Sequence, residues 1–402
     1  MFFIKRLEDP DHRLLGPVLK GLKFWRLWQP AVPSSPILVY NWTHIFTTLL
    51  TIGQYIELWR IRDNLDLALR NISVTMISTM CAAKAASFIY GHKDWASIVE
   101  YVSNIEKEQL LKGDRITASI IEKYTKYARK LTYFYWFLVT ATACAMTVTP
   151  LFKYLASADY RYIIKNGTAA YPEMLSSWYP FDQTRGLGYF ISYLGNFSLT
   201  FYGSGVLANY DSNAIVLMVF FDGQLKILSE NCARLFDEGV EAGNHNKSVK
   251  KIKECHNHHL DLLKFSSLLN SLLSPVMFLY VVICSLTIFS SAVQLTMEDI
   301  TTVQCLWLMQ YLVALIFQLF IYCWHGNEVL YMSNEVDNGV YSSAWWSQSV
   351  PIRRSVLLLA GQLRRPIIFT AGPFTALSLS TFVNVSMLGS YFYAYLFTNL
   401  MH

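Results

Sequence analysis

Long apolar runs alternate with polar, charged segments along the whole length of this chain. Seven runs are long enough to cross the hydrocarbon core of a bilayer, which takes about 20 helical residues. They lie near residues 37–56, 67–90, 131–155, 188–210, 265–293, 303–324 and 374–400. The pattern shows no internal repeat, which gives little support to an inverted-repeat transporter. The sequence therefore predicts an all-α membrane protein with seven transmembrane helices.

Ionisable residues inside two of these runs raise separate questions. The second run is the weakest, because Arg70 and Lys84 lie within it. Lys84 falls in its inner half, where we expect the ammonium to extend to the inner interface rather than to serve an ion pathway. The fourth run is followed by the polar residues 210–213 and then by "AIVLMVFF". This second apolar stretch predicts that the fourth helix continues beyond the membrane.

Composition agrees with a membrane protein. The chain has 402 residues, of which 53% are hydrophobic and 15% are charged, whereas soluble proteins carry about a quarter of their residues as charges. The net charge of +5 does not indicate a nucleic-acid partner, because the basic residues lie between the apolar runs and form no patch. We therefore expect this protein to lie in the lipid bilayer and to bind no nucleic acid.

The distribution of basic residues predicts the orientation. Twenty-five of the 33 Lys and Arg residues lie on one side of the predicted membrane, five lie on the other and three lie within the spans. Because basic loops stay in the cytoplasm, the N-terminus is predicted to be cytoplasmic and the C-terminus extracellular. Arg364 and Arg365 then mark the cytoplasmic start of the last helix. Asn166, in a glycosylation sequon of an outer loop, is predicted to be lumenal.

Several functional classes are disfavoured by the same observations. A seven-helix receptor that couples to G proteins has the opposite orientation, and this chain has no "DRY"-like triplet after the third run and no "NPxxY" in the seventh. No nucleophile–base constellation or phosphate-binding loop indicates an enzyme. The segment "CHNHH" at 255–259 suggests a zinc site, but it lacks a second ligand cluster, so a solvated cytoplasmic helix explains it better. No metal or other cofactor is expected.

The C-terminal part of the chain carries a set of short motifs in a fixed order. They are "GNE" after the sixth run, the aromatic "AWW", "RRPIIFTAG", "LSLSTF", and a closing Ser-Tyr-x-Tyr-x-x-Leu at Ser390, Tyr391, Tyr393 and Leu396. Over about the last 75 residues the chain resembles insect odorant receptors, and the outer loop "WYPFD" at 178–182 is similar to that family as well. The earlier part resembles it only in its predicted topology.

The resemblance implies a ligand-gated cation channel in the plasma membrane. In that family a tuned subunit and a shared co-receptor form a heterotetramer around a central pore for permeant cations, and the last helix lines it. The loop between the fourth and fifth helices lacks the long insertion of the co-receptor, so this chain is similar to a tuned, odorant-binding subunit. Residues 1–325 would then hold six helices and the odorant site, and residues 326–402 a cytoplasmic anchor and the pore helix. Asp211 is expected to pair within the anchor region.

The resemblance also implies a gate in the last helix. Aligning Tyr393 with the family's tyrosine places Leu396 at the hydrophobic constriction and Asn399 at the polar residue just outside it. A ring of leucine-sized side chains closes a pore by excluding water. Interhelical packing is the other interpretation of the polar residues in this helix. The alternatives for the whole protein are a gustatory-type channel subunit, then a metabotropic seven-helix receptor, then a structural membrane protein.

A site for a small volatile molecule is expected in the outer half of the bundle. Aromatic residues repeat there at i, i+4 on the fourth and sixth helices. Methionine residues on the second helix, and a cysteine and a threonine on the third, occur at similar depth. Such a lining suits an uncharged hydrophobic ligand, although membrane aromatics also serve in packing. The predicted lining residues are Met76, Met80, Cys144, Thr147, Tyr189, Tyr193, Phe197, Trp307 and Tyr311.

Overall fold

The computed structural model describes most of the chain. The described residues are 9, 11–29, 41–156, 161–162, 164, 171, 174–183, 186–236, 245–295 and 302–387. Every statement below concerns these residues. Of the predicted functional positions, Leu396, Asn399 and Asn166 lie outside them, and their roles stay predictions.

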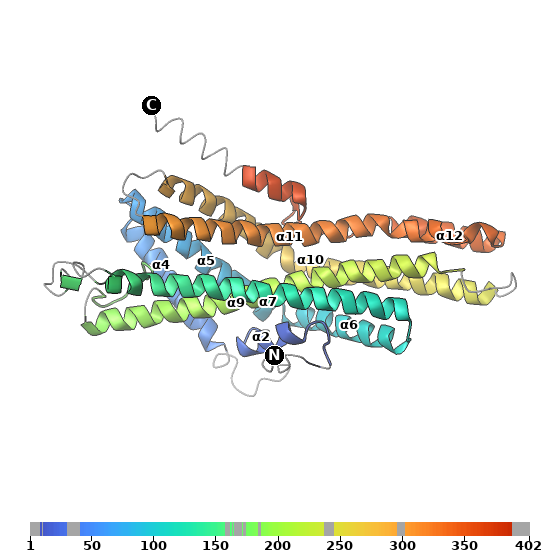
Figure 1. The fold of residues 1–402 in the computed structure, drawn as a ribbon, viewed down its shortest axis with the longest axis horizontal. Helices are drawn as coiled ribbons and strands as arrows, with labels where there is room; N and C mark the ends of the chain where they lie inside the picture. The colour runs from blue at the N-terminus through green and yellow to red at the C-terminus, as the bar shows by residue number, and fades with distance from the viewer. Residues whose placement is uncertain are drawn as a thin grey trace, which may run out of the picture.

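The described part of the protein is almost entirely helical, as the sequence predicts (Figure 1). The main helices are α2 (Gly16–Phe24), α4 (Trp42–Arg60), α5 (Leu65–Tyr90), α6 (His92–Leu111), α7 (Arg115–Ala156), α9 (Gly186–Ala233), α10 (His245–Leu295), α11 (Thr302–Ser342) and α12 (Val350–Leu363). A short 3-10 helix, η1 (Trp345–Ser347), separates the last two, and residues 379–387 form a further helical segment. The strands β1 (Thr370–Ala371) and β2 (Thr375–Ala376) make a small antiparallel hairpin.

Five of these helices are long and apolar enough to cross a membrane. The corresponding stretches are Leu67–Tyr90, Arg115–Val148, Gly186–Ala233, Asn246–Ser291 and Leu308–Ser342. They match the second to sixth predicted runs, so the protein is a multi-pass membrane protein. The first run is present as α4, which begins at Trp42, and the last is described only to residue 387. Seven crossings, the orientation and the division at residue 325, which falls within the continuous α11, stay predictions.

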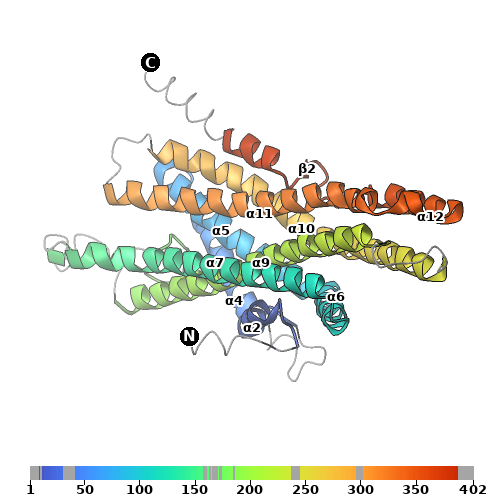
Figure 2. The same cartoon turned by 45° about the vertical axis from the view of Figure 1, so that its right-hand side comes forward.

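Helix α9 forms the centre of the bundle. In the most apolar 18-residue stretch of α9, 89% of the residues are buried. The helix runs without a break through residues 210–213, which confirms that it continues past this polar segment. It lies beside α7 in both views (Figures 1 and 2) and packs against α11 along much of its length. A helix with no polar face is stable only when neighbours surround it. Close packing is needed at Gly223, where an added Cβ would overlap the Tyr124 ring.

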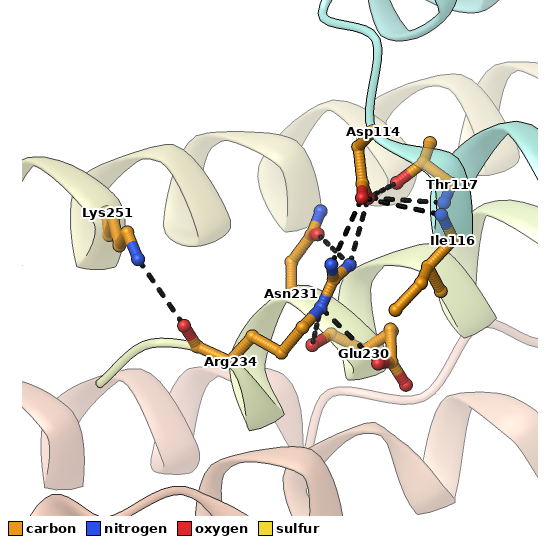
Figure 3. A network of polar contacts seen from close by, with 7 residues as sticks. All are labelled: Asp114, Ile116, Thr117, Glu230, Asn231, Arg234 and Lys251. Atoms are coloured by element: carbon orange, nitrogen blue, oxygen red, sulfur yellow. Dashed lines mark hydrogen bonds and ion pairs between the residues drawn. The ribbon is translucent and has the colours of Figure 1, made fainter. Parts of the chain in front are cut away.

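The C-terminal end of α9, which is predicted to be cytoplasmic, is bound to the turn between α6 and α7 (Figure 3). Arg234 donates two hydrogen bonds to the carboxylate of Asp114, at 3.2 and 3.0 Å. Asp114 in turn accepts from the backbone and hydroxyl of Thr117 at the start of α7. The Arg234 guanidinium, followed by the Thr117 bonds, holds the pKa of the Asp114 carboxyl well below its usual range. The charge of Asp114 therefore both caps α7 and fixes it to α9.

The hairpin before the last helix is bound to α10. The backbone N–H of Thr370 donates to Asn270 Oδ1 at 2.8 Å, and that of Gly372 donates to the Ser274 carbonyl at 3.0 Å. Gly372 has a φ of +69°, a conformation that glycine adopts without strain. The start of the helical segment at 379 is thereby placed against the middle of α10.

Candidate functional site

A mostly apolar cavity of about 150 Å³ lies among α5, α7, α9, α10 and α11. We call it the inner cavity. Small residues on two helices leave the space: Gly203 on α9, where an added Cβ would lie 3.2 Å from Cys81 Sγ, and Ala314 on α11. Aliphatic side chains such as Leu199 and Ile283 form much of the rest of the wall. A cavity of this kind suits a small, uncharged molecule.

A buried charged group forms one end of the inner cavity. Asp211 on α9 is fully buried, and its Oδ1 accepts from Lys84 Nζ and from Tyr322 Oη, both at 2.6 Å. Its Oδ2 accepts from Tyr135 Oη at 2.6 Å and from Gln318 Nε2 at 2.7 Å. We call these five residues the Asp211 cluster. It connects α5, α7, α9 and α11, and Lys84, Tyr135 and Gln318 also line the cavity.

This arrangement corrects two predictions. The expectation that Lys84 extends to the inner interface was wrong, because its side chain is only 1% exposed and forms an ion pair with Asp211. Asp211 was expected to pair within the anchor, but its partners come from α5 and α7 as well as from α11. Burying a charged group is costly unless the group is paired and hydrogen-bonded. Four donors around one carboxylate meet that condition.

Tyrosine rings complete the lining close to the Asp211 cluster. Tyr280 donates its hydroxyl to the Leu315 carbonyl at 3.0 Å, and Tyr311 donates to the Ser73 carbonyl at 3.3 Å. Both side chains are buried and both line the inner cavity. Because these hydroxyls are bonded to backbone oxygens, the rings offer the cavity mainly an aromatic surface.

A second cavity of about 610 Å³ lies among α2, α7 and α9. We call it the outer cavity, because its lining residues come from α2, α7 and α9 and not from the core helices α5, α10 and α11 that line the inner cavity. Trp25, which follows α2, and Trp136 of α7 contribute to its wall. Ala143, Thr200 and Ser204 line both cavities, so the two are separated by little more than these side chains.

The predicted lining residues are divided between the two cavities. Met80 and Tyr311 line the inner cavity, whereas Cys144, Thr147 and Phe197 line the outer one. Of the other four, Met76 packs against the hydrophobic core, and the Tyr189 ring stacks on that of Tyr171. The Tyr193 hydroxyl donates to the Thr147 carbonyl at 3.2 Å. The Trp307 side chain lies outside the described part of the protein. The structure does not bring the eight described residues into a single cavity, and the roles of all nine in binding stay predictions.

The histidine-rich segment at 255–259 is only partly solvated. Cys255 is 6% exposed and His259 is fully buried, whereas Asn257 is exposed. His258 contacts Gln224 of α9 through its Nε2 at 3.1 Å. The interpretation as a solvated helix is therefore wrong for the inward face, which packs against α9. Among the described residues, no group of three His, Cys, Asp or Glu side chains is placed to hold a metal ion.

Several residues around the inner cavity were not predicted from the sequence: Lys84, Tyr135, Tyr280, Ala314 and Gln318. One signal was present for Lys84. It follows Met80 by four residues, so the two share a face of α5, and Met80 was already predicted to line the site. Gln318 and Ala314 are likewise four residues apart on α11. No local pattern indicated which residue would neutralise Lys84.

Comparison with known proteins gives consistent matches over the chain. A family model described as "7tm Odorant receptor" matches residues 64–388. Odorant receptor Or2 of Anopheles gambiae is 25% identical over 182 residues, which cover 44% of this chain and 47% of that relative, about half its length. Odorant receptor 82a of Drosophila melanogaster is 23% identical over 326 residues, which cover 81% of this chain and 82% of that relative.

The fold is similar to solved structures as well. The structure of the insect olfactory receptor OR5 from Machilis hrabei in complex with eugenol superposes with a TM-score of 0.80 at 17% sequence identity. The alignment covers 97% of this chain and 100% of that one. A second structure of the same receptor gives a TM-score of 0.79. At this level of identity, the similarity establishes the fold.

Proposed function

This chain belongs to the 7tm odorant receptor family, and from that premise we propose that it is the odorant-binding subunit of an odorant-gated cation channel. The observation that carries the proposal is the inner cavity, which is mostly apolar and lies among five helices. Burial of apolar ligand surface there contributes on the order of 25 cal/mol per Å². A small, uncharged volatile is the ligand class that such a wall favours.

The proposed link from ligand to channel runs through α11. Tyr311, Ala314 and Gln318 of α11 line the inner cavity. The same helix holds the segment before the final helix, because Ser333 accepts from the Ile367 backbone at 2.8 Å. A ligand that displaces α11 by a small amount would therefore shift the base of the final helix. Leu396 at the constriction and Asn399 outside it are the proposed gate and permeation residues.

Assembly with the shared co-receptor as a heterotetramer in the plasma membrane is part of the proposal. It is supported by membership of the odorant receptor family. The N-terminus is proposed to be cytoplasmic and the C-terminus extracellular, on the strength of the basic-residue distribution. A metabotropic receptor would have the opposite orientation.

Coexpression with the co-receptor should yield an inward cation current when neutral volatiles are applied. The reason is that the ligand acts on the channel directly, so the current needs no G protein. The measurement is whole-cell recording against a panel of volatiles, with G-protein signalling blocked in parallel. Cells that express either subunit alone are the control. Absence of any response to a broad panel, despite confirmed surface expression of both chains, contradicts the proposed function.

An epitope tag after His402 should be labelled on intact cells. A tag before Met1 should be labelled only after permeabilisation, because twenty-five basic residues hold that side in the cytoplasm. The two tags are matched controls for each other, and antibody labelling with and without detergent is the measurement. Labelling of the C-terminal tag only after permeabilisation would overturn the proposed orientation and favour the metabotropic alternative.

A further inference from the structure

The ammonium of Lys84 has hydrogen-bonding capacity that the described residues do not use. An ammonium carries three N–H donors, and Lys84 Nζ donates to Asp211 Oδ1 at 2.6 Å. The ring centroids of Tyr210 and Tyr280 lie 5.5 and 5.6 Å away, which provides a weaker electrostatic contact. Among the described residues, Lys84 Nζ has no second hydrogen-bond acceptor. Lys84 is nonetheless part of the lining of the inner cavity.

Most other donors around the inner cavity are already engaged. The hydroxyls of Tyr135, Tyr280 and Tyr311 donate to Asp211 or to backbone carbonyls. Thr142 donates to the Leu138 carbonyl at 2.9 Å, and Ser78 to the Val74 carbonyl at 3.3 Å. Among the described lining residues, Lys84 is therefore the charged donor with unused N–H groups, and charge-assisted hydrogen bonds are roughly twice as strong as neutral ones.

The charge balance of the cluster restricts the ligand further. Lys84 and Asp211 together are neutral, and both are almost fully buried. A carboxylate ligand on Lys84 would add a second negative charge close to Asp211, and an amine would add a positive charge close to Lys84. Both would place an unbalanced charge in a membrane interior, which is unfavourable. A neutral ligand with an oxygen acceptor leaves the balance unchanged.

We infer that Lys84 is the donor that orients the ligand, and that the inner cavity selects neutral volatiles with a carbonyl oxygen, such as ketones, aldehydes and esters. This inference rests on the proposed function, since it takes the inner cavity as the ligand site. The carbonyl oxygen lies at the Lys84 end, and the apolar body lies against Leu199, Ile283 and the tyrosine rings. A hydrocarbon of the same shape fills the same space but leaves the ammonium N–H without an acceptor.

The test compares pairs of ligands that differ only in an oxygen. Acetophenone is paired with α-methylstyrene, and cyclohexanone with methylenecyclohexane, because each hydrocarbon replaces the carbonyl oxygen by a methylene group. Affinity for the full-length protein in detergent is measured from the ligand-dependent shift in unfolding temperature. Each affinity is divided by the hexadecane–water partition coefficient, which removes the difference in ligand desolvation. After this correction each ketone should bind about tenfold tighter than its hydrocarbon. In the uncorrected affinities, the cationic α-methylbenzylamine should bind more weakly than acetophenone and α-methylstyrene.

Two variants assign the effect to Lys84. Lys84→Met combined with Asp211→Asn removes both charges together and should reduce the ketone preference about tenfold while hydrocarbon affinity changes little. Thr142→Val is the matched control, because it removes a lining hydroxyl that is already bonded to the Leu138 carbonyl; the preference should persist. If the wild type shows no ketone preference in either pair, or if the double variant keeps it in full, the inference is overturned and the proposed function stands. If none of the ligands binds the wild type, the inference fails, and the proposed function fails with it only if the broad panel also gives no response. The wild-type comparison remains decisive should the double variant not fold.

Discussion

Lys84→Met should reduce the folded protein at the cell surface to a small fraction of the wild-type amount. The substitution leaves the fully buried carboxylate of Asp211 without its counter-charge. Removing one partner of a buried ion pair costs about 3–5 kcal/mol, whereas the whole stability of a domain is about 5–15 kcal/mol. Surface biotinylation and the unfolding temperature of the solubilised protein measure the loss. Asp211→Asn should be destabilising as well, because it leaves the buried Lys84 ammonium without its counter-charge.

The double variant Lys84→Met with Asp211→Asn should recover most of the surface expression. Both charges are then absent, and the amide introduced at position 211 can still exchange hydrogen bonds with Tyr135 and Tyr322. Replacing a buried pair by neutral groups is often nearly neutral in stability, so the double-mutant cycle should give a large coupling energy. Lys107→Met is the matched control, because its ion pair with Asp11 is exposed and contributes little. Wild-type expression of Lys84→Met would show that the pair is not needed for folding.

Ala314→Trp should abolish the response to all volatiles by filling the inner cavity. The indole would occupy most of a space of about 150 Å³, so we expect the concentration for half-activation to rise at least a hundredfold, beyond the measurable range for weak ligands. Overpacking costs about 1–3 kcal/mol, which leaves surface expression reduced but measurable. Currents are normalised to surface protein in each variant.

The neighbouring position provides the control for this experiment. Val313 is 62% exposed and does not line the inner cavity, so Val313→Trp should leave the response unchanged. Cys144→Trp would fill the outer cavity instead. A lost response in Cys144→Trp together with a normal response in Ala314→Trp would move the ligand site to the outer cavity and refute its assignment to the inner one.

The long apolar helices were predictable because each appears in the sequence as a long apolar run, whereas α2, α6 and α12 were not predicted. The continuation of α9 through residues 210–213 is an example: an apolar stretch on both sides of a short polar segment indicates one long buried helix. The start of α4 was predicted less well, because the apolar run was expected to begin near residue 37, whereas α4 begins at Trp42. Apolar runs report burial or lipid contact, and they fix helix ends only to within a few residues.

The cavity was predicted less well, and the reason lies in the residues that make space. The prediction followed the large aromatic residues of α9, Tyr189, Tyr193 and Phe197, which repeat on one face of that helix. The inner cavity instead uses the face with Leu199, Gly203 and Leu207, which repeats with the same spacing. A cavity forms where side chains are small, so glycine and alanine mark it better than aromatic side chains do. The pairing of Lys84 with Asp211 had no local signal, because it depends on contact between two separate helices.

The buried ion pair also has a consequence for the biogenesis of the protein. Lys84 is translated 127 residues before Asp211, a delay of roughly 6–25 s at about 5–20 residues per second. During that interval α5 must enter the bilayer with an uncompensated lysine, which disfavours insertion by about 2.5–3.5 kcal/mol near the middle of a helix. We therefore expect the early helices to stay close to the translocon until α9 emerges. A ribosome that stalls before residue 211 leaves a membrane-embedded cation without a partner, which is the kind of defect that membrane quality control can recognise.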